Sequence, residues 1–135
     1  MPALDEFCTI EATMGFEMIG SVPAGTRLDV PFEGMASSTR WDGELAVRGV
    51  DYVTIRSDGN MALDIRARMG QGKGMVSYRG TGVSVVPERG IAEPRELLTF
   101  ETANEDFAYL NTAVGVAVGR GEGPNLSLTV YLLNP

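Results

Sequence analysis

The sequence predicts an all-β fold, a single antiparallel β-barrel of about nine to ten strands. Three observations lead to this prediction. Seventeen Gly and seven Pro are spread along the 135 residues and leave little room for long helices. Between them lie short runs rich in β-branched and aromatic residues, with the alternating polarity that is typical of strands. Finally, Ser57-Asp58-Gly59-Asn60 separates two such runs, and Asp-Gly is a strong signal for a tight β-hairpin.

The N-terminal half supplies five of the expected strands. The first is Phe7 to Thr13, where Cys8, Ile10 and Ala12 share one face and Phe7, Thr9 and Glu11 share the other. The other elements expected here are a turn at Val22–Gly25, a strand at Arg27–Phe32, a strand at Trp41–Val47 with Trp41, Gly43, Leu45 and Val47 on one face, and the hairpin Gly49–Arg66.

The C-terminal half contains a glycine-rich segment, Met69 to Met75, in which three glycines surround Lys73. Exposed backbone amides of this kind can cradle a phosphate. The segment lacks the Gly-Lys-Ser/Thr ending and a following helix, so we interpret it as a hairpin connection. The elements expected after it are strands at Met75–Tyr78 and Val83–Val86, an irregular connection at Pro87–Pro94, one helical turn at Glu93–Leu98, and strands at Ala113–Val118 and Leu126–Leu132.

The composition excludes several classes of function. The chain has no histidine and a single cysteine, Cys8, which removes Ser-His and Cys-His nucleophile pairs and nearly excludes a zinc site. An all-oxygen site for magnesium or calcium is conceivable, but no calcium-loop spacing is present. We therefore expect no metal and no cofactor. The net charge of −7 argues against nucleic acid and anionic membranes as partners.

Length and patterning predict one domain, residues 1–135. No apolar stretch approaches the roughly 20 residues of a membrane helix, so we expect a soluble protein. With one cysteine and no charged-then-apolar leader before the first strand, a cytoplasmic location is expected.

The first candidate site lies on the predicted hairpin. Alternation places Asp64, Arg66 and Arg68 on one face of its second strand and Met61, Leu63 and Ile65 on the other. If the apolar face packs outward against a partner subunit, the polar face lines the barrel interior. If the apolar face fills the core, Asp64 and Arg66 are simply solvated. Arg56 in the preceding strand is close enough to join the cluster and to anchor an anion or phenolate.

The second candidate site combines Phe100-Glu101-Thr102 with the segment Phe107 to Asn111. Aromatic and polar groups alternate here, as in small-molecule pockets with apolar walls and a few fixed polar groups. Glu101 and Tyr109 are the candidates for proton transfer. The alternative is a loop anchored on the barrel by Phe107 and Leu110, in which Asn111 satisfies local backbone groups.

Several short motifs follow one another over nearly the whole length of the sequence. They are Pro23-Ala24-Gly25 with Arg27, Val30-Pro31 and Gly34, then Gly49-x-Asp51, Arg56-x-Asp58-Gly59, Leu63-Asp64-x-Arg66, Tyr78-x-Gly80, Phe100-Glu101-Thr102, Tyr109-Leu110-Asn111 and Val116-x-Val118-Gly119. In their order and spacing they resemble the DUF3237 or UPF0311 family of small bacterial and fungal proteins. The resemblance implies a single antiparallel β-barrel, calycin-like or allene-oxide-cyclase-like, that commonly self-associates, and it implies that Asp51, Arg56, Asp64, Arg66, Tyr78, Glu101 and Asn111 form a shared site.

Three functions fit these observations. The first is a cofactor-independent lyase, isomerase or cyclase acting on a small aromatic or polyketide-like molecule in the barrel. In it Glu101, Asp64 and Tyr109 move protons, and the substrate is bound by Arg56, Arg66, Asp51, Tyr78 and Asn111. The second is a non-catalytic barrel that binds a small molecule, and the third is an oligomeric scaffold without a pocket function.

Overall fold

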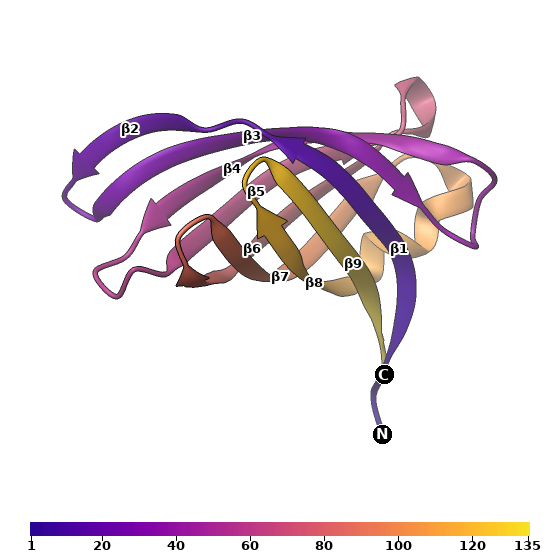
Figure 1. The fold of residues 1–135 in the computed structure, drawn as a ribbon. Coiled ribbons are helices and arrows are strands. Elements are labelled where there is room, and N and C mark those ends of the chain that lie inside the picture. The colour runs from indigo at the N-terminus through magenta and orange to yellow at the C-terminus, as the bar shows by residue number, and fades with distance from the viewer.

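The computed structural model describes residues 1–135 and is built almost entirely of strands (Figure 1). Two short 3₁₀ helices, η1 and η2, interrupt them. The elements are β1 (Ala3–Met14), β2 (Glu17–Val22), β3 (Gly25–Ser37), β4 (Glu44–Ile55), β5 (Met61–Met69), η1 (Gly72–Gly74), β6 (Val76–Glu88), β7 (Ile91–Thr102), η2 (Glu105–Thr112), β8 (Val114–Glu122) and β9 (Asn125–Asn134).

The strands form one antiparallel sheet in the order β1-β9-β8-β7-β6-β5-β4-β3-β2. An additional pairing of β1 with β3 closes eight of them into a barrel and leaves β2 outside, paired with β3 alone. Where β1 meets β3, the backbones approach so closely that a Cβ at Gly34 would overlap the carbonyl oxygen of Glu11. The prediction of a single antiparallel barrel is confirmed, and so is the hairpin at Ser57–Asn60, which joins β4 to β5.

The core fills the inside of the barrel because the strands alternate inward and outward residues. In β5, Leu63, Ile65 and Ala67 are buried, whereas Asp64 and Arg66 are exposed. Two alternatives were open for this strand, and the structure adopts the one in which the apolar side chains fill the core and the charged ones face solvent.

A β-bulge alters the predicted faces of β1. Cys8, Ile10 and Ala12 lie inside, as predicted, but Phe7 is also buried, with 2% of its surface exposed. The register between β1 and β9 shifts between Glu6 and Cys8, and the extra residue of a bulge interrupts strict alternation. Phe7 therefore turns inward instead of sharing the outer face with Thr9 and Glu11.

Two other predictions are corrected by the pairing of the strands. The helical turn expected at Glu93–Leu98 is absent, because this segment lies within β7 and pairs with both β6 and β8. Trp41 does not begin a strand, since β4 starts at Glu44. Trp41 instead lies in the connection from β3 and packs its ring against Phe7 and Phe107.

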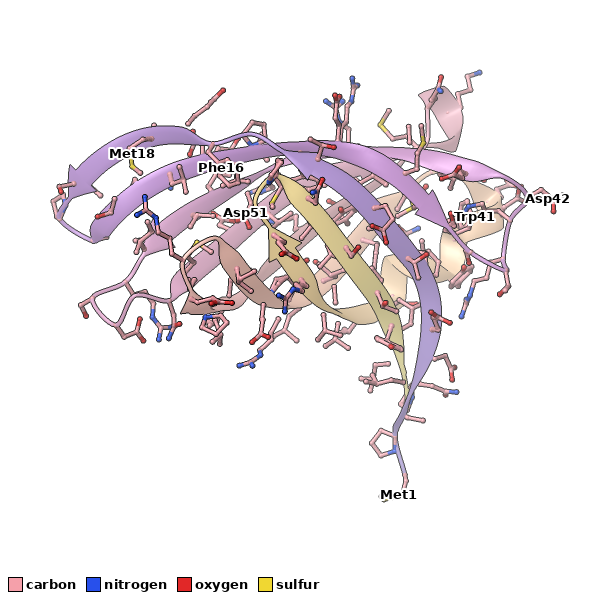
Figure 2. All side chains as sticks on the ribbon, in the orientation of Figure 1. Met1, Phe16, Met18, Trp41, Asp42 and Asp51 are labelled. Carbon is pink, nitrogen blue, oxygen red and sulfur yellow. The ribbon has the colours of Figure 1, made fainter.

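The two ends of the barrel differ. At one end, η2 and the β3–β4 connection cover the opening (Figure 1). At the other end lie β2, the adjoining part of β3, and the three turns β4–β5, β6–β7 and β8–β9. In Figure 2, Trp41 and Asp42 lie at the covered end, and Phe16 and Met18 lie at the opposite one. The barrel thus has the form of a cup.

Candidate functional site

A cavity of about 640 Å³ occupies the open end of the barrel. This volume lies within the range of about 300–1,000 Å³ that is usual for small-molecule sites. Its walls are predominantly apolar and come mainly from β3, β4, β5, β6, β7 and β9, and its rim includes residues of the three turns. Representative wall residues are Leu28, Val30, Val53, Leu63, Ile65 and Leu128.

An aromatic cluster closes the other end of the barrel. The ring of Phe7 lies 5.5 Å from that of Trp41 and 6.1 Å from that of Phe100, both in edge-to-face geometry. Trp41 in turn contacts Phe107 of η2 at 5.7 Å, and Leu110 of η2 is fully buried. Edge-to-face pairs of this kind are favourable beyond the area they bury. The cluster therefore forms the floor of the cup.

Asp51, on β4, is one of two carboxyl groups that line the cavity; Figure 2 labels its position. Its Oδ1 accepts a hydrogen bond from the backbone N–H of Asp64 on β5 at 3.0 Å. Burial raises the pKa of Asp51 to about 6, and the hydrogen bond from Asp64 opposes the rise. Asp51 is therefore held in place by the backbone and titrates close to neutral pH.

Glu96 is the second carboxyl group, and β7 places it in the same cavity with only 7% of its surface exposed. Desolvation, followed by the nearby charge of Asp51, raises the pKa of Glu96 to about 8. No hydrogen bond offsets this rise, and no fully buried side-chain oxygen in the protein lacks a partner. The Glu96 carboxyl therefore opens onto the cavity and carries a proton at neutral pH.

Two buried hydroxyl groups also belong to the polar lining. Tyr78 is buried on β6, where its ring lies 6.2 Å from that of Phe100 in the floor. Burial and the neighbouring Glu96 raise the pKa of Tyr78 above its ordinary value, so the phenol stays protonated. Ser84 lies further along β6 and is also buried. Both hydroxyls can donate a hydrogen bond to a ligand oxygen.

Of the residues predicted for the site, Asp51 and Tyr78 lie in the cavity lining, and the other six do not. Asp64 and Arg66 are on the outer face of β5. Arg56 is exposed and forms an ion pair with Asp58 in the β4–β5 turn, which lowers the pKa of Asp58 to about 2. Asp64 and Arg66 lie outside because the apolar residues with which they alternate in β5 occupy the interior, whereas Arg56 lies beyond the end of β4.

The second predicted cluster lies at the closed end, outside the barrel. Glu101 is exposed on β7, and Tyr109 is 41% exposed beneath the guanidinium of Arg40, 5.5 Å from its ring centroid. Asn111 accepts the backbone N–H of Thr102 at 2.8 Å and donates to its carbonyl oxygen at 3.0 Å. Asn111 thus fastens η2 to β7, which matches the alternative of an anchored loop.

Sequence reasoning missed Glu96, Ser84 and Arg89, all of which line the cavity. The sequence does contain a signal that could have identified Glu96. Pro94, Glu96 and Leu98 alternate on one face of a strand, and the neighbouring residues on that face are apolar, which is the pattern of an inward-facing position. The interpretation of Glu93–Leu98 as a helical turn concealed this alternation.

The side chains do not create an evident metal centre, since no three His, Cys, Asp or Glu residues are grouped as ligands. The structure also has no helix with the length and hydropathy required to cross a membrane.

Three solved structures resemble this fold over almost the whole chain. A protein of unknown function from Clostridium acetobutylicum ATCC 824 is 21% identical, with a TM-score of 0.86 and coverage of 99% of this chain and 100% of that one. A conserved protein of unknown function from Rhodopseudomonas palustris is 18% identical, with a TM-score of 0.85 and 99% coverage of both chains. A β-barrel-like protein from Acinetobacter baumannii AYE is 18% identical, with a TM-score of 0.82 and coverage of 99% and 97%.

No curated protein matches the sequence. Residues 2–133 match the family described as "Protein of unknown function (DUF3237)". This match spans nearly all of the chain, including all residues of the cavity and every strand except the last residue of β9. The chain therefore belongs to the DUF3237 family.

Proposed function

We propose that this protein is a cofactor-independent isomerase, lyase or cyclase that moves protons on a small, largely apolar molecule held in the barrel. Small aromatic or polyketide-like ketones are the substrate class that suits the lining best. The observation that carries the proposal is the presence of Asp51 and Glu96 in one apolar cavity, each in a different hydrogen-bonding environment. Pairs of carboxyl groups whose environments separate their pKa values are suited to act as base and acid.

The hydrogen bond from Asp64 favours the ionised form of Asp51, so Asp51 is the candidate general base. Glu96 lacks such a donor and keeps its proton, so it is the candidate general acid. In the isomerisation of a β,γ-unsaturated ketone, Asp51 takes the proton from the α-carbon while Glu96 donates its proton to the ketone oxygen, which gives a dienol. Return of the proton from Asp51 to the γ-carbon, with Glu96 regaining its own from the dienol oxygen, gives the conjugated α,β-unsaturated ketone.

The apolar walls exclude water from the reacting groups. This strengthens the interactions of both Asp51 and Glu96 with the substrate. The Tyr78 hydroxyl lies in the same lining and can donate a hydrogen bond to the oxygen of the substrate. These groups need no further reagent for a proton transfer.

The experiment is incubation of the protein with a panel of aromatic and polyketide-like ketones in D₂O, followed by mass spectrometry of the small molecules. We expect deuterium incorporation or conversion with the natural protein, and loss of both in Asp51→Asn and Glu96→Gln. The matched controls are Asp42→Asn and Glu101→Gln, which alter exposed carboxylates outside the cavity. Equal activity in all four variants would overturn the assignment.

The second candidate function is a binding protein that retains its ligand unchanged. The apolar lining and the volume of the cavity favour it, because neither feature requires catalysis. Native mass spectrometry would then detect a bound molecule of unaltered mass in the natural protein and in Glu96→Gln alike. Self-association and a cytoplasmic location stay predictions.

A further inference from the structure

The charges that line the cavity are arranged unevenly. Asp51 and Glu96 face the interior from β4 and β7, whereas Arg89 belongs to the β6–β7 turn on the rim. Arg89 is the single basic residue among those that line the cavity. From Ile91, where β7 begins at the rim, to Glu96 the strand rises by about 16 Å. The charged side chains that line the cavity are therefore two acidic groups in the interior and one basic group, Arg89, at the rim.

Arg89 is available to a ligand. Arg89 forms no ion pair. The three ion pairs of the protein join Arg27 to Asp29, Arg56 to Asp58, and Arg120 to Glu122. The carboxylate of Glu122, on the strand that faces Ile91, is held by Arg120 at 3.6 Å. Glu88, the residue before Arg89, is exposed and belongs to none of these pairs. A guanidinium in this position can bind a carboxylate with two parallel hydrogen bonds.

We infer that the ligand of this cavity is an amphipathic monocarboxylic acid, bound with its carboxylate at Arg89 and a neutral oxygen-bearing group near Asp51 and Glu96. The reverse orientation would bury a carboxylate beside Asp51, where like charges and desolvation both oppose it. This inference rests on the proposed function, because it specifies the substrate of the same cavity. Arg89 then sets the orientation that brings the reactive end of the substrate to the two carboxyl groups.

The test uses three probes with the same chain length and different ends: ω-hydroxydodecanoate, dodecanediol and dodecanedioate. Their affinities are measured by isothermal titration calorimetry at pH 8 and low salt. We expect the hydroxy acid to bind about tenfold more tightly than the diol, because it gains a charge-assisted hydrogen bond to Arg89. We also expect it to bind about tenfold more tightly than the diacid, whose second carboxylate must enter the acidic interior.

Arg89→Gln should remove the advantage of the hydroxy acid over the diol and leave the affinity for the diol unchanged. Arg79→Gln is the matched control, because Arg79 is exposed on the outer face of β6. The advantage should also shrink in high salt, since Arg89 is exposed to solvent. Equal affinities for the hydroxy acid and the diol, an equal loss in Arg79→Gln, or no binding of any probe would overturn the inference.

The probes contain no ketone, so their binding does not depend on turnover. If Arg89 discriminates among them while no ketone exchanges deuterium, the inference stands and the proposed catalysis fails. If ketones are converted but Arg89→Gln has no effect on the probes, the catalysis stands and the inference fails.

Discussion

The carboxylate of Asp51 accepts a hydrogen bond from the backbone N–H of Asp64, across the β4–β5 ladder, at 3.0 Å. The ladder pairs Asp51 with Ile65 and Thr54 with Ala62, but it has no pair between these two rungs. A side chain thus serves as the acceptor for a main-chain donor inside the barrel wall. The same bond fixes one oxygen of Asp51 and leaves the other available to the cavity.

Replacing Asp51 should separate its structural role from its charge. Asp51→Asn keeps an oxygen acceptor for the N–H of Asp64, whereas Asp51→Leu leaves that donor without a partner. We therefore expect Asp51→Leu to be less stable than Asp51→Asn by about 1–3 kcal/mol. Urea denaturation of both variants at pH 7 measures the difference. Equal free energies of unfolding would show that the bond contributes nothing.

Stability should fall as the pH rises, because of Glu96. Its pKa is about 8 in the folded protein and 4.5 in the unfolded chain, so the folded state holds the proton more tightly between these values. Raising the pH through this window removes stability, at about 1.4 kcal/mol per pKa unit of difference. Glu96→Gln should raise the free energy of unfolding by about 2–4 kcal/mol at pH 9 and leave it unchanged at pH 4.

Denaturant titrations of the natural protein and of Glu96→Gln at the two pH values check this prediction. Glu101→Gln is the control, because Glu101 is exposed on the same strand. A pH dependence that is identical in all three proteins would contradict the burial of a protonated Glu96.

The rate of the proposed reaction should follow a bell-shaped pH profile. Asp51 can act as the general base only when it is ionised, above about pH 6. Glu96 can act as the general acid only when it is protonated, below about pH 8. Because the two groups interact, the limbs report two apparent pKa values of the pair. Measurement of kcat/KM from pH 4 to 10 with a substrate from the ketone panel tests this. A rate independent of pH would exclude these groups from the chemistry.

Filling the open end of the barrel should abolish binding without unfolding the protein. Ala92 lines the cavity near the rim, and a tryptophan there would occupy part of the entrance. We expect Ala92→Trp to reduce the affinity for anilinonaphthalene sulfonate by about tenfold or more, measured by its fluorescence. Thr99→Trp, on the outer face of β7, should bind it like the natural protein. Equal fluorescence in both variants would place the dye elsewhere.

Local signals made much of the fold predictable. The Asp58-Gly59 turn and the alternation of buried and exposed residues in β5 depend on neighbouring residues, and the sequence predicts both correctly. The bulge at Phe7 and the pairing of β1 with β3 depend on segments that are distant in sequence. No local pattern therefore predicts them.

The candidate site was harder to predict for the same reason. Asp64 and Arg66 were visible as a charged face, but only the closed barrel decides that this face is the outer one. Glu96 lies in a segment that the sequence pattern suggests is a helical turn, and that interpretation conceals the single buried carboxyl group of β7. Asp51 and Tyr78 were found through the family resemblance, and the structure places both in the cavity lining.

The closure of the barrel also has a consequence for biosynthesis. β1 pairs on one side with β3 and on the other with β9, so that Thr9 faces both Ser37 and Thr129. The ribosome makes β1 before β9, so β1 through β8 must all emerge before β1 can pair with β9. Contacts so distant in sequence slow folding and prolong the exposure of unpaired strand edges. The nascent chain is therefore most vulnerable to aggregation just before its last strand is released.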